Sequence, residues 1–286
     1  MKHDDFVALL EIGQDASGRT VLPVGESATG QIFGGQILAQ LIAATPADRT
    51  VKSLHAVFPR AGRPSDPLYL GLENTHDGRS LGTRRALVYQ DQHLGGRRVV
   101  ATASVLLDVA DDDEHDYQYD AIAASDPLSA KQINLAIVPG DTRLISAVGL
   151  DETTAEPAEL AFWMRCADFG DPALAKPLLA YVSDWPLIGT LLKAVPGVSQ
   201  QDAHVRLQTA VVSHSIWFHQ VFDISQWLRI EVRGRRLAGG RGFGTGAVYT
   251  RTGALVASFA QESVIRRFAP SQGGNDDRGN VRSLRG

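Results

Sequence analysis

The chain has 286 residues, of which 44% are hydrophobic and 21% are charged, and its formal net charge is −4. This composition can bury the core of one large domain or two ordinary ones, and the weakly acidic balance argues against nonspecific nucleic-acid binding. No apolar run reaches the ~20 residues that a membrane span needs, and Met1 to Asp5 lack the features of a signal peptide. The single cysteine, Cys166, cannot form an internal disulfide. We therefore expect a globular, cytoplasmic protein.

The first third of the chain predicts one helix followed by an antiparallel sheet. Apolar residues recur at helical spacing from Ile37 to Ala44, and Thr45-Pro46 ends that run. Short β-rich runs bounded by turn residues follow, and they predict strands at 54–58, 68–73, 83–90 and 99–107.

The middle of the chain is polar and leads to a second helix. The acidic run from Asp108 to Asp116 predicts a solvated turn into a linker. Asp171-Pro172 supply an N-cap and a first-turn proline for a helix over 173–183. We therefore predict a first unit at 1–115, a linker at 116–157, a second unit at 158–268 and a disordered tail at 269–286.

The two predicted units share sequence blocks in the same order, about 160 residues apart. The matched blocks are 53–58 with 213–218, 78–83 with 240–245, and 99–102 with 255–258. Because the matches include strand interiors, duplication explains them better than a shared preference for turn residues. We place His55 and His214 at matching positions of the two copies, which favours a structural role over metal binding.

Six blocks also match a known family: 32–36, 53–58, 76–80, 181–184, 214–219 and 258–262. The His-Ser-Ile-Trp-Phe-His and Gln-Glu blocks are the specific ones. Together the blocks resemble the TesB-like type II acyl-CoA thioesterases over about Val24 to Arg267. The resemblance implies an α+β double hotdog fold, in which each unit wraps an antiparallel sheet around one long helix. It also implies hydrolysis of fatty acyl-CoA to free fatty acid and CoA.

In this family a carboxylate, a hydroxyl residue and a glutamine jointly hold the attacking water. The carboxylate falls on Asp184 and the glutamine on Gln261, whereas the hydroxyl position, three residues before His214, is Val211. Valine can neither donate nor accept a hydrogen bond through its side chain. The acidic residue that the family usually has immediately before the histidine is Ser213 here.

Three interpretations of Val211 stay open. Asp184 and Gln261 could suffice, at a rate lowered by roughly 10²-fold. Thr209 or Ser213, which strict strand alternation places on the same face as Val211, could substitute for the hydroxyl. Alternatively, the protein is a non-catalytic acyl-CoA-binding sensor or scaffold. An enoyl-CoA hydratase is a weaker interpretation, because no suitable His and acidic pair is evident on the central helix.

Four residues are assigned to substrate binding: Gly34, Gly35, Gln36 and His55. The two glycines at a helix start offer unobstructed N–H groups and a positive dipole end, which suits polarisation of a thioester carbonyl. Close packing of the helix explains them equally well.

Arginines suit the phosphates of CoA, and two groups of them occur, at 79, 84, 85, 97 and 98 and at 233, 235 and 236. The sequence has no phosphate-cradling loop and no His/Cys cluster, so it predicts neither cofactor nor metal. We expect a fatty acyl-CoA substrate, no nucleic-acid partner, no membrane span and a homo-oligomer, since hotdog units commonly associate.

Overall fold

The computed structural model describes residues 1–27, 29–45, 49–93, 95–109, 115–119, 125–146 and 149–268. Within these residues, 13 strands form one sheet in the order β1-β2-β4-β5-β6-β3-β10-β13-β12-β11-β9-β8-β7. The helices are α1 (His3–Leu9), α2 (Gly34–Ala43), α3 (Pro172–Ser183) and α4 (Pro186–Leu192), with 3-10 turns at Pro127–Ser129 and Gln200–Asp202.

The strands of the first half are β1 (Gly13–Gln14), β2 (Thr20–Leu22), β3 (Thr50–Val57), β4 (Leu68–Asp77), β5 (Leu81–Asp91) and β6 (Arg97–Asp108). Those of the second half are β7 (Lys131–Ile133), β8 (Asp141–Leu144), β9 (Glu159–Arg165), β10 (Leu207–Phe218), β11 (Leu228–Ala238), β12 (Arg241–Thr250) and β13 (Leu255–Arg267). The strands predicted at 54–58, 68–73, 83–90 and 99–107 are thus confirmed as β3 to β6.

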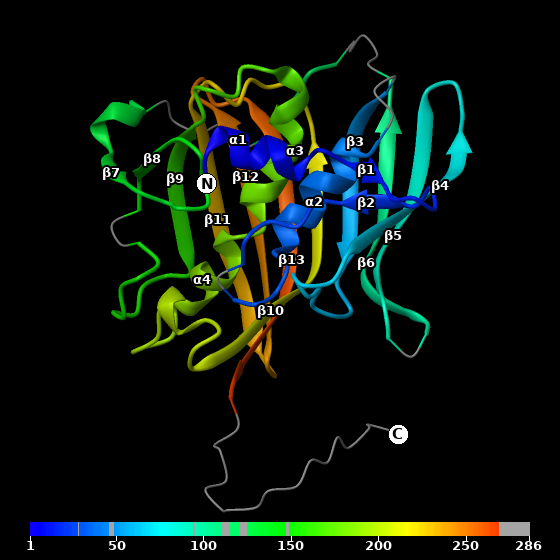
Figure 1. Cartoon of the computed structure of the whole chain (residues 1–286). Helices are drawn as coiled ribbons and strands as arrows, with labels where there is room; N and C mark the ends of the chain where they lie inside the picture. Colours follow the sequence, from blue (N-terminus) through cyan, green and yellow to red (C-terminus); the bar gives the residue numbers. More distant parts are fainter. Residues whose placement is uncertain are drawn as a thin grey trace, which may run out of the picture.

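The two halves meet where β3 pairs with β10 (Figure 1). From this seam the order is β3-β6-β5-β4 on one side and β10-β13-β12-β11 on the other, so strands of the two copies that correspond in chain order lie at equivalent places. The repeat block at 53–58 lies in β3 and the residue that follows it, and its partner block at 213–218 lies in β10. His55 pairs directly with Ser215, and Ser53 pairs with Trp217. Because residue 215 is also the repeat counterpart of residue 55, a local pseudo-two-fold axis passes between them. The predicted duplication therefore appears as an approximate symmetry of the sheet.

The register corrects the assignment of His55 and His214 to matching positions. His214 pairs with Ala56, so its repeat counterpart is Leu54, whereas His55 pairs with Ser215. A shift of one residue along a strand moves a side chain to the other face of the sheet. His214 accordingly faces the helices and is fully buried, while His55 lies on the opposite face.

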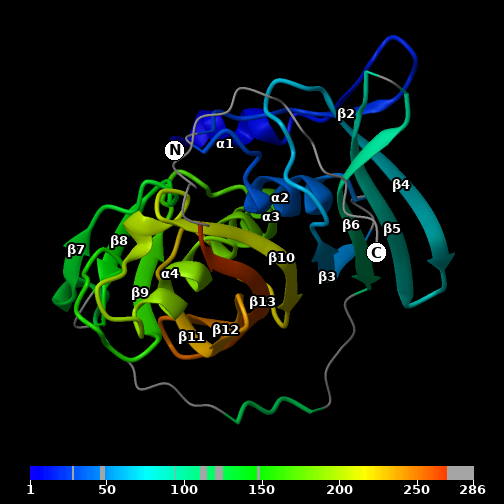
Figure 2. The same cartoon turned by 90° about the horizontal axis from the view of Figure 1, so that it is seen from below.

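Helices α2 and α3 lie side by side on one face of the sheet near the seam, and the second half of the sheet curls around α4 (Figures 1 and 2). We call the face of the sheet that α2, α3 and α4 cover the inner face, and the opposite face the outer face. The predicted helix at 37–44 is confirmed, although it begins three residues earlier, at Gly34. The helix predicted at 173–183 is also confirmed, and the Asp171 side chain accepts a hydrogen bond from the Ala173 N–H at its start.

A kink separates α3 from α4. Asp184 and Trp185 keep helical backbone angles, but Pro186 follows them and has no N–H to continue the helical hydrogen bonds. The kink therefore ends α3 at Asp184, instead of placing that residue in the middle of one long helix.

The segment predicted as a linker, 116–157, contributes to the sheet in part. Strands β7 and β8 lie within it, and β8 pairs with β9 through Thr142 with Met164 and Leu144 with Phe162. The linker prediction is wrong for these strands, because elements of three or four residues carry too little alternation to be recognised in a sequence. The tail predicted at 269–286 lies outside the described residues.

The ring of Phe259 in β13 packs directly on Gly246 of β12, so no space is left for a side chain at that glycine. A Cβ at Gly246 would lie 2.1 Å from the Phe259 ring, whereas a Cβ at Gly71 of β4 would meet its nearest atom only at 3.9 Å. We expect Gly246→Ala to lower the free energy of unfolding by about 1–3 kcal/mol through overpacking. Gly71→Ala, the matched control, should leave it unchanged or slightly raised. Urea unfolding of both variants checks this, and equal midpoints would contradict it.

Candidate active site

Asp184 lies at the kink and joins the two halves of the molecule. Its side chain is only 3% exposed, and its Oδ2 accepts a hydrogen bond of 3.0 Å from the backbone N–H of Gly35. Gly35 is in the first turn of α2, a helix whose N-cap residue Phe33 makes no side-chain cap bond. The carboxylate of one half thus caps the helix of the other half, where the helix dipole favours negative charge.

Two glycines make this approach possible. A Cβ at Gly34 would lie 2.9 Å from Asp184 Oδ2, and a Cβ at Gly35 would lie 2.4 Å from the carbonyl oxygen of Tyr181. Any larger residue would push α2 away from the end of α3. Close packing, one of the two explanations of this pair, is therefore a direct feature of the site.

The second oxygen of Asp184 is buried and unused. Among the described residues, Oδ1 has no hydrogen-bond partner, and the Nδ1 of His214 lies 3.9 Å from it. Burial raises the pKa of Asp184 to about 7, against the opposing effect of the Gly35 N–H. A carboxyl group that ionises near neutral pH and has a free oxygen can accept a proton from a bound water.

His214 links the end of α3 to β13. Its Nε2 lies 3.0 Å from the hydroxyl of Ser183, and its Nδ1 lies 3.0 Å from Oε1 of Gln261. Burial lowers the pKa of His214 to about 4, although the hydrogen bond to Gln261 acts in the opposite direction. The ring is therefore neutral at physiological pH and can donate through only one of its nitrogens.

Gln261 is 1% exposed and continues this chain of hydrogen bonds. Its Nε2 donates to the hydroxyl of Ser263 at 3.1 Å, and Ser263 is itself fully buried. Ser183, His214 and Ser263 were not identified as site residues from the sequence. A signal existed for two of them, because Ser183 adjoins Asp184 and Ser263 lies two residues after Gln261, on the same strand face.

A β-bulge decides which side chains near Val211 face this network. Val211 pairs with Ser263 and His214 pairs with Gln261, so the chain gains one extra residue, Val212, between the two pairs. Val211 and His214 consequently both face inward. Ser213 pairs with Glu262 and faces outward. The expectation that Ser213 shares a face with Val211 is wrong, because strict alternation does not hold across a bulge.

Thr209 does share the inner face with Val211, as expected. It is 2% exposed, pairs with Ile265, and its hydroxyl lies 3.4 Å from Nε2 of His204. Its contacts are thus made at the far end of the strand pair from Gln261.

Among the described residues of the first half, the place equivalent to this polar network is apolar. Leu54 and Val105 pair with each other at the positions that His214 and Gln261 occupy in the second half, and both are buried. The pseudo-symmetric place is therefore filled with apolar side chains, and the polar chemistry exists on one side of the axis.

The remaining residues predicted to bind substrate have other contacts. The amide of Gln36 donates to the Pro23 carbonyl and accepts from the Gly25 N–H, which fastens the chain before α2. His55 stands on the outer face, with its Nε2 3.2 Å from the Ser53 hydroxyl and its ring edge-on to Trp217. Neither geometry supports contact with a group held at Asp184.

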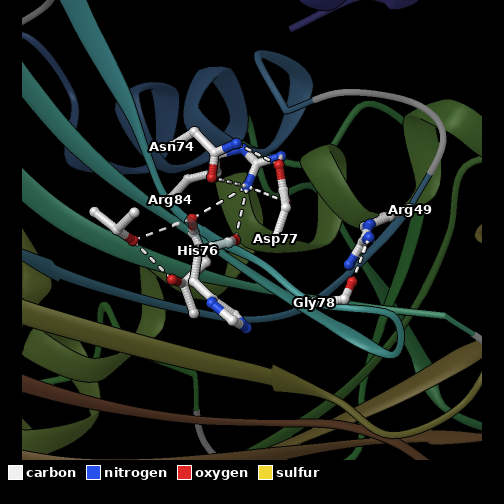
Figure 3. A network of polar contacts seen from close by, with 8 residues as sticks. Arg49, Asn74, His76, Asp77, Gly78 and Arg84 are labelled. Atoms are coloured by element: carbon white, nitrogen blue, oxygen red, sulfur yellow. Dashed lines mark hydrogen bonds and ion pairs between the residues drawn. The ribbon is translucent and has the colours of Figure 1, made fainter.

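Arg84, one of the arginines considered for the phosphates of CoA, is used inside the fold (Figure 3). Its guanidinium donates to Asp77 Oδ1 at 2.7 Å and to Asn74 Oδ1 at 3.0 Å, and the residue is 7% exposed. The nearby Arg49 donates to the carbonyl of Gly78 at 2.7 Å. These contacts fasten the β4–β5 hairpin and leave Arg84 no free edge for a ligand.

Two cavities lie away from Asp184. A groove of about 770 Å³ lies on the outer face of the first half, where His55, Arg85 and Thr102 line it. A smaller apolar hollow of about 180 Å³ lies beyond the end of α4, between Leu207, Leu237 and Ile265. Ile265 follows Ser263 on the inner face of β13, so the hollow adjoins the strand pair that carries the polar network.

Within the described ranges, no group of three or more His, Cys, Asp or Glu residues could hold a metal ion. No helix in the same ranges is long and apolar enough to cross a membrane.

Comparison with known proteins gives consistent results for both halves. Residues 23–107 match the family model of the acyl-CoA thioesterase N-terminal domain, and residues 112–265 match that of the C-terminal domain. Human acyl-coenzyme A thioesterase 8 is 28% identical over 82% of this chain and 81% of its own length. Acyl-CoA thioesterase 2 of Haemophilus influenzae is 27% identical over 82% of this chain and 88% of its own.

Solved structures agree with these matches. The tesB protein of Mycobacterium avium subspecies paratuberculosis is 28% identical, with a TM-score of 0.75 over 92% of this chain and 98% of its own. The acyl-CoA thioesterase II TesB2 of Mycobacterium marinum is 26% identical, with a TM-score of 0.69 over 93% and 99% of the two chains. The double hotdog fold is confirmed, and the chain belongs to the TesB-like type II acyl-CoA thioesterase family.

Proposed function

We propose that this protein hydrolyses fatty acyl-CoA to the free acid and CoA, using a water that Asp184 activates and Gln261 orients. Family membership supports a thioester hydrolase, and one observation carries the assignment of the site. The Oδ1 of Asp184 is a buried carboxylate oxygen without a partner in the described structure, at the positive end of α2. A buried acceptor of this kind requires a hydrogen-bond donor, and a water would supply it.

The reaction follows from the contacts of Asp184. Oδ2 is held by the Gly35 N–H, which leaves Oδ1 to take a proton from the water as its oxygen bonds to the thioester carbon. The N–H of Gly34, the first helical residue, has no partner within its own helix and can donate to the carbonyl oxygen as negative charge develops there. The carbon–sulfur bond then breaks, and the proton passes from Asp184 to the CoA sulfur.

Gln261 has the hydrogen-bonding capacity to orient the water. One proton of its amide group is donated to Ser263, and its oxygen is bonded to His214. The second amide proton is left for the water or the thioester. We infer that the acyl chain runs from Gln261 along β13 toward the apolar hollow near Ile265, so turnover should depend on chain length.

A non-catalytic acyl-CoA-binding protein is the alternative, and Val211 is the observation that favours it. Without a hydroxyl at that position, the same site could hold the thioester without hydrolysing it. Binding and turnover separate the two functions: a binding protein retains acyl-CoA but releases no CoA at any chain length.

We expect wild-type protein to release CoA from a panel of acyl-CoAs, and Asp184→Asn to lower kcat by about 10²-fold or more through loss of the base. The wild-type kcat should rise with pH through about 7 and level off above it, because only the ionised carboxylate can accept the proton. The exposed Asp223 provides the control Asp223→Asn, with unchanged kcat. Full activity in Asp184→Asn would exclude Asp184 as the base.

Released CoA can be followed with a thiol reagent on native protein. Burial, with a smaller contribution from the charges of Asp141 and Asp168, raises the pKa of the Cys166 thiol to about 12, so this group is almost entirely protonated and unreactive in the assay.

The same ionisation predicts a dependence of stability on pH. The pKa of Asp184 is about 7 in the folded state and 3.8 in the unfolded state, so folding becomes less favourable as pH rises from about 4 to about 7. Asparagine cannot ionise. From pH 5 to pH 8, Asp184→Asn should therefore gain roughly 2–3 kcal/mol of unfolding free energy relative to wild type. Urea unfolding at both pH values measures this, and parallel pH curves would show that Asp184 is not desolvated.

A further inference from the structure

The polar network contains a hydroxyl directly opposite the residue that lacks one. Val211 of β10 and Ser263 of β13 are paired across the strands, and both face inward because of the bulge at Val212. Directly opposed residues on one face have Cβ atoms about 4.5–5.5 Å apart. A hydroxyl at position 263 is therefore presented to the same region of the inner face as a hydroxyl at position 211 would be.

Ser263 is in contact with the group proposed to orient the water. It is 0% exposed, and its hydroxyl lies 3.1 Å from Nε2 of Gln261. Among the described residues Gln261 is its only side-chain partner, so this serine is dedicated to the amide. Of the two hydroxyl residues considered from the sequence, Thr209 contacts His204, and Ser213 points to the outer face of the sheet.

We propose that Ser263 is a positioning residue that supplies, from β13, the hydroxyl that β10 lacks at Val211. The proposal rests on the proposed hydrolysis and deepens it. Ser263 fixes the rotation of the Gln261 amide, and Gln261 in turn orients the water at Asp184. The Gln261 amide then has a partner at both ends, although the hydroxyl that it contacts stands on β13 and not on β10.

The role of Ser263 does not depend on the direction of the hydrogen bonds. If the Ser183 hydroxyl donates to His214, then His214 Nδ1 donates to the Gln261 oxygen and the Gln261 nitrogen donates to Ser263. If Ser183 donates to the Ala180 carbonyl instead, His214 Nε2 donates to Ser183, the Gln261 amide group is turned by 180° so that its nitrogen donates to His214 Nδ1, and Ser263 donates to the amide oxygen. A hydroxyl can serve in both directions, whereas alanine leaves one end of the buried amide unpaired in either.

The test moves the hydroxyl from one strand to the other. We expect Ser263→Ala to lower kcat about tenfold with KM within twofold, and to leave the pH midpoint near 7 unchanged, because Asp184 is untouched. Val211→Thr, which conserves side-chain shape, should restore most of the kcat when added to Ser263→Ala. Val211→Thr alone should change kcat less than twofold, since the hydroxyl is already present. Ser258→Ala, on the outer face of β13, is the matched control and should have wild-type kcat.

Three results would overturn the proposal. These are an unaffected kcat in Ser263→Ala, a loss that Val211→Thr does not restore, and a marked rise of kcat in Val211→Thr alone, which shows that the hydroxyl was missing. The last variant decides the question even if Ser263→Ala fails to fold. Wild-type protein that binds acyl-CoA but releases no CoA would instead refute the hydrolase, and the role of Ser263 with it.

Discussion

The hydrogen bond from the Gly35 N–H to Asp184 is the contact on which the site depends. It joins the start of α2, from the first half, to the end of α3, from the second, and it spans 3.0 Å between buried groups. The bond requires the kink at Pro186, which places Asp184 at a helix end, and glycines at 34 and 35, which let the two helix ends meet. A single half contains only one of the two partners, so the site forms only where the two halves meet.

The duplication also explains why there is one site and not two. The pseudo-two-fold axis between His55 and Ser215 generates a second location for the polar network, and Leu54 and Val105 fill it. Two buried polar networks would each require complete hydrogen bonding, whereas an apolar pair stabilises the core without that requirement. One half thus serves the other as a scaffold and as the donor of the helix terminus.

Much of this arrangement was predictable from the sequence. The helix over 37–44 follows from periodicity, the helix over 173–183 from its N-cap and first-turn proline, and β3 to β6 from β-rich runs between turn residues. The positions of Asp184 and Gln261 were taken from the family resemblance. Two of the errors concern the face on which a side chain lies, because alternation along a strand fixes that face only while the register is known and unbroken. The bulge at Val212 reversed the expected face of Ser213, and a one-residue offset in the repeat misplaced His55. A bulge depends on pairing with a neighbouring strand, which local sequence does not reveal.

The burial of Asp184 and His214 determines which of the two groups is charged at a given pH. Burial keeps Asp184 protonated between about pH 4 and 7, and it keeps His214 neutral between about pH 4 and 6.5. As pH rises through these ranges, Asp184 therefore lowers the free energy of unfolding and His214 raises it. Moving the Asp184 proton to His214 would create an ion pair across 3.9 Å, and the same burial disfavours both charges. Above pH 7 Asp184 is the one of these two groups that becomes charged, and among the described residues the Gly35 N–H is its only hydrogen-bond donor. That unpaired charge destabilises the folded protein, and the raised pKa that goes with it suits the role of base that we propose for Asp184.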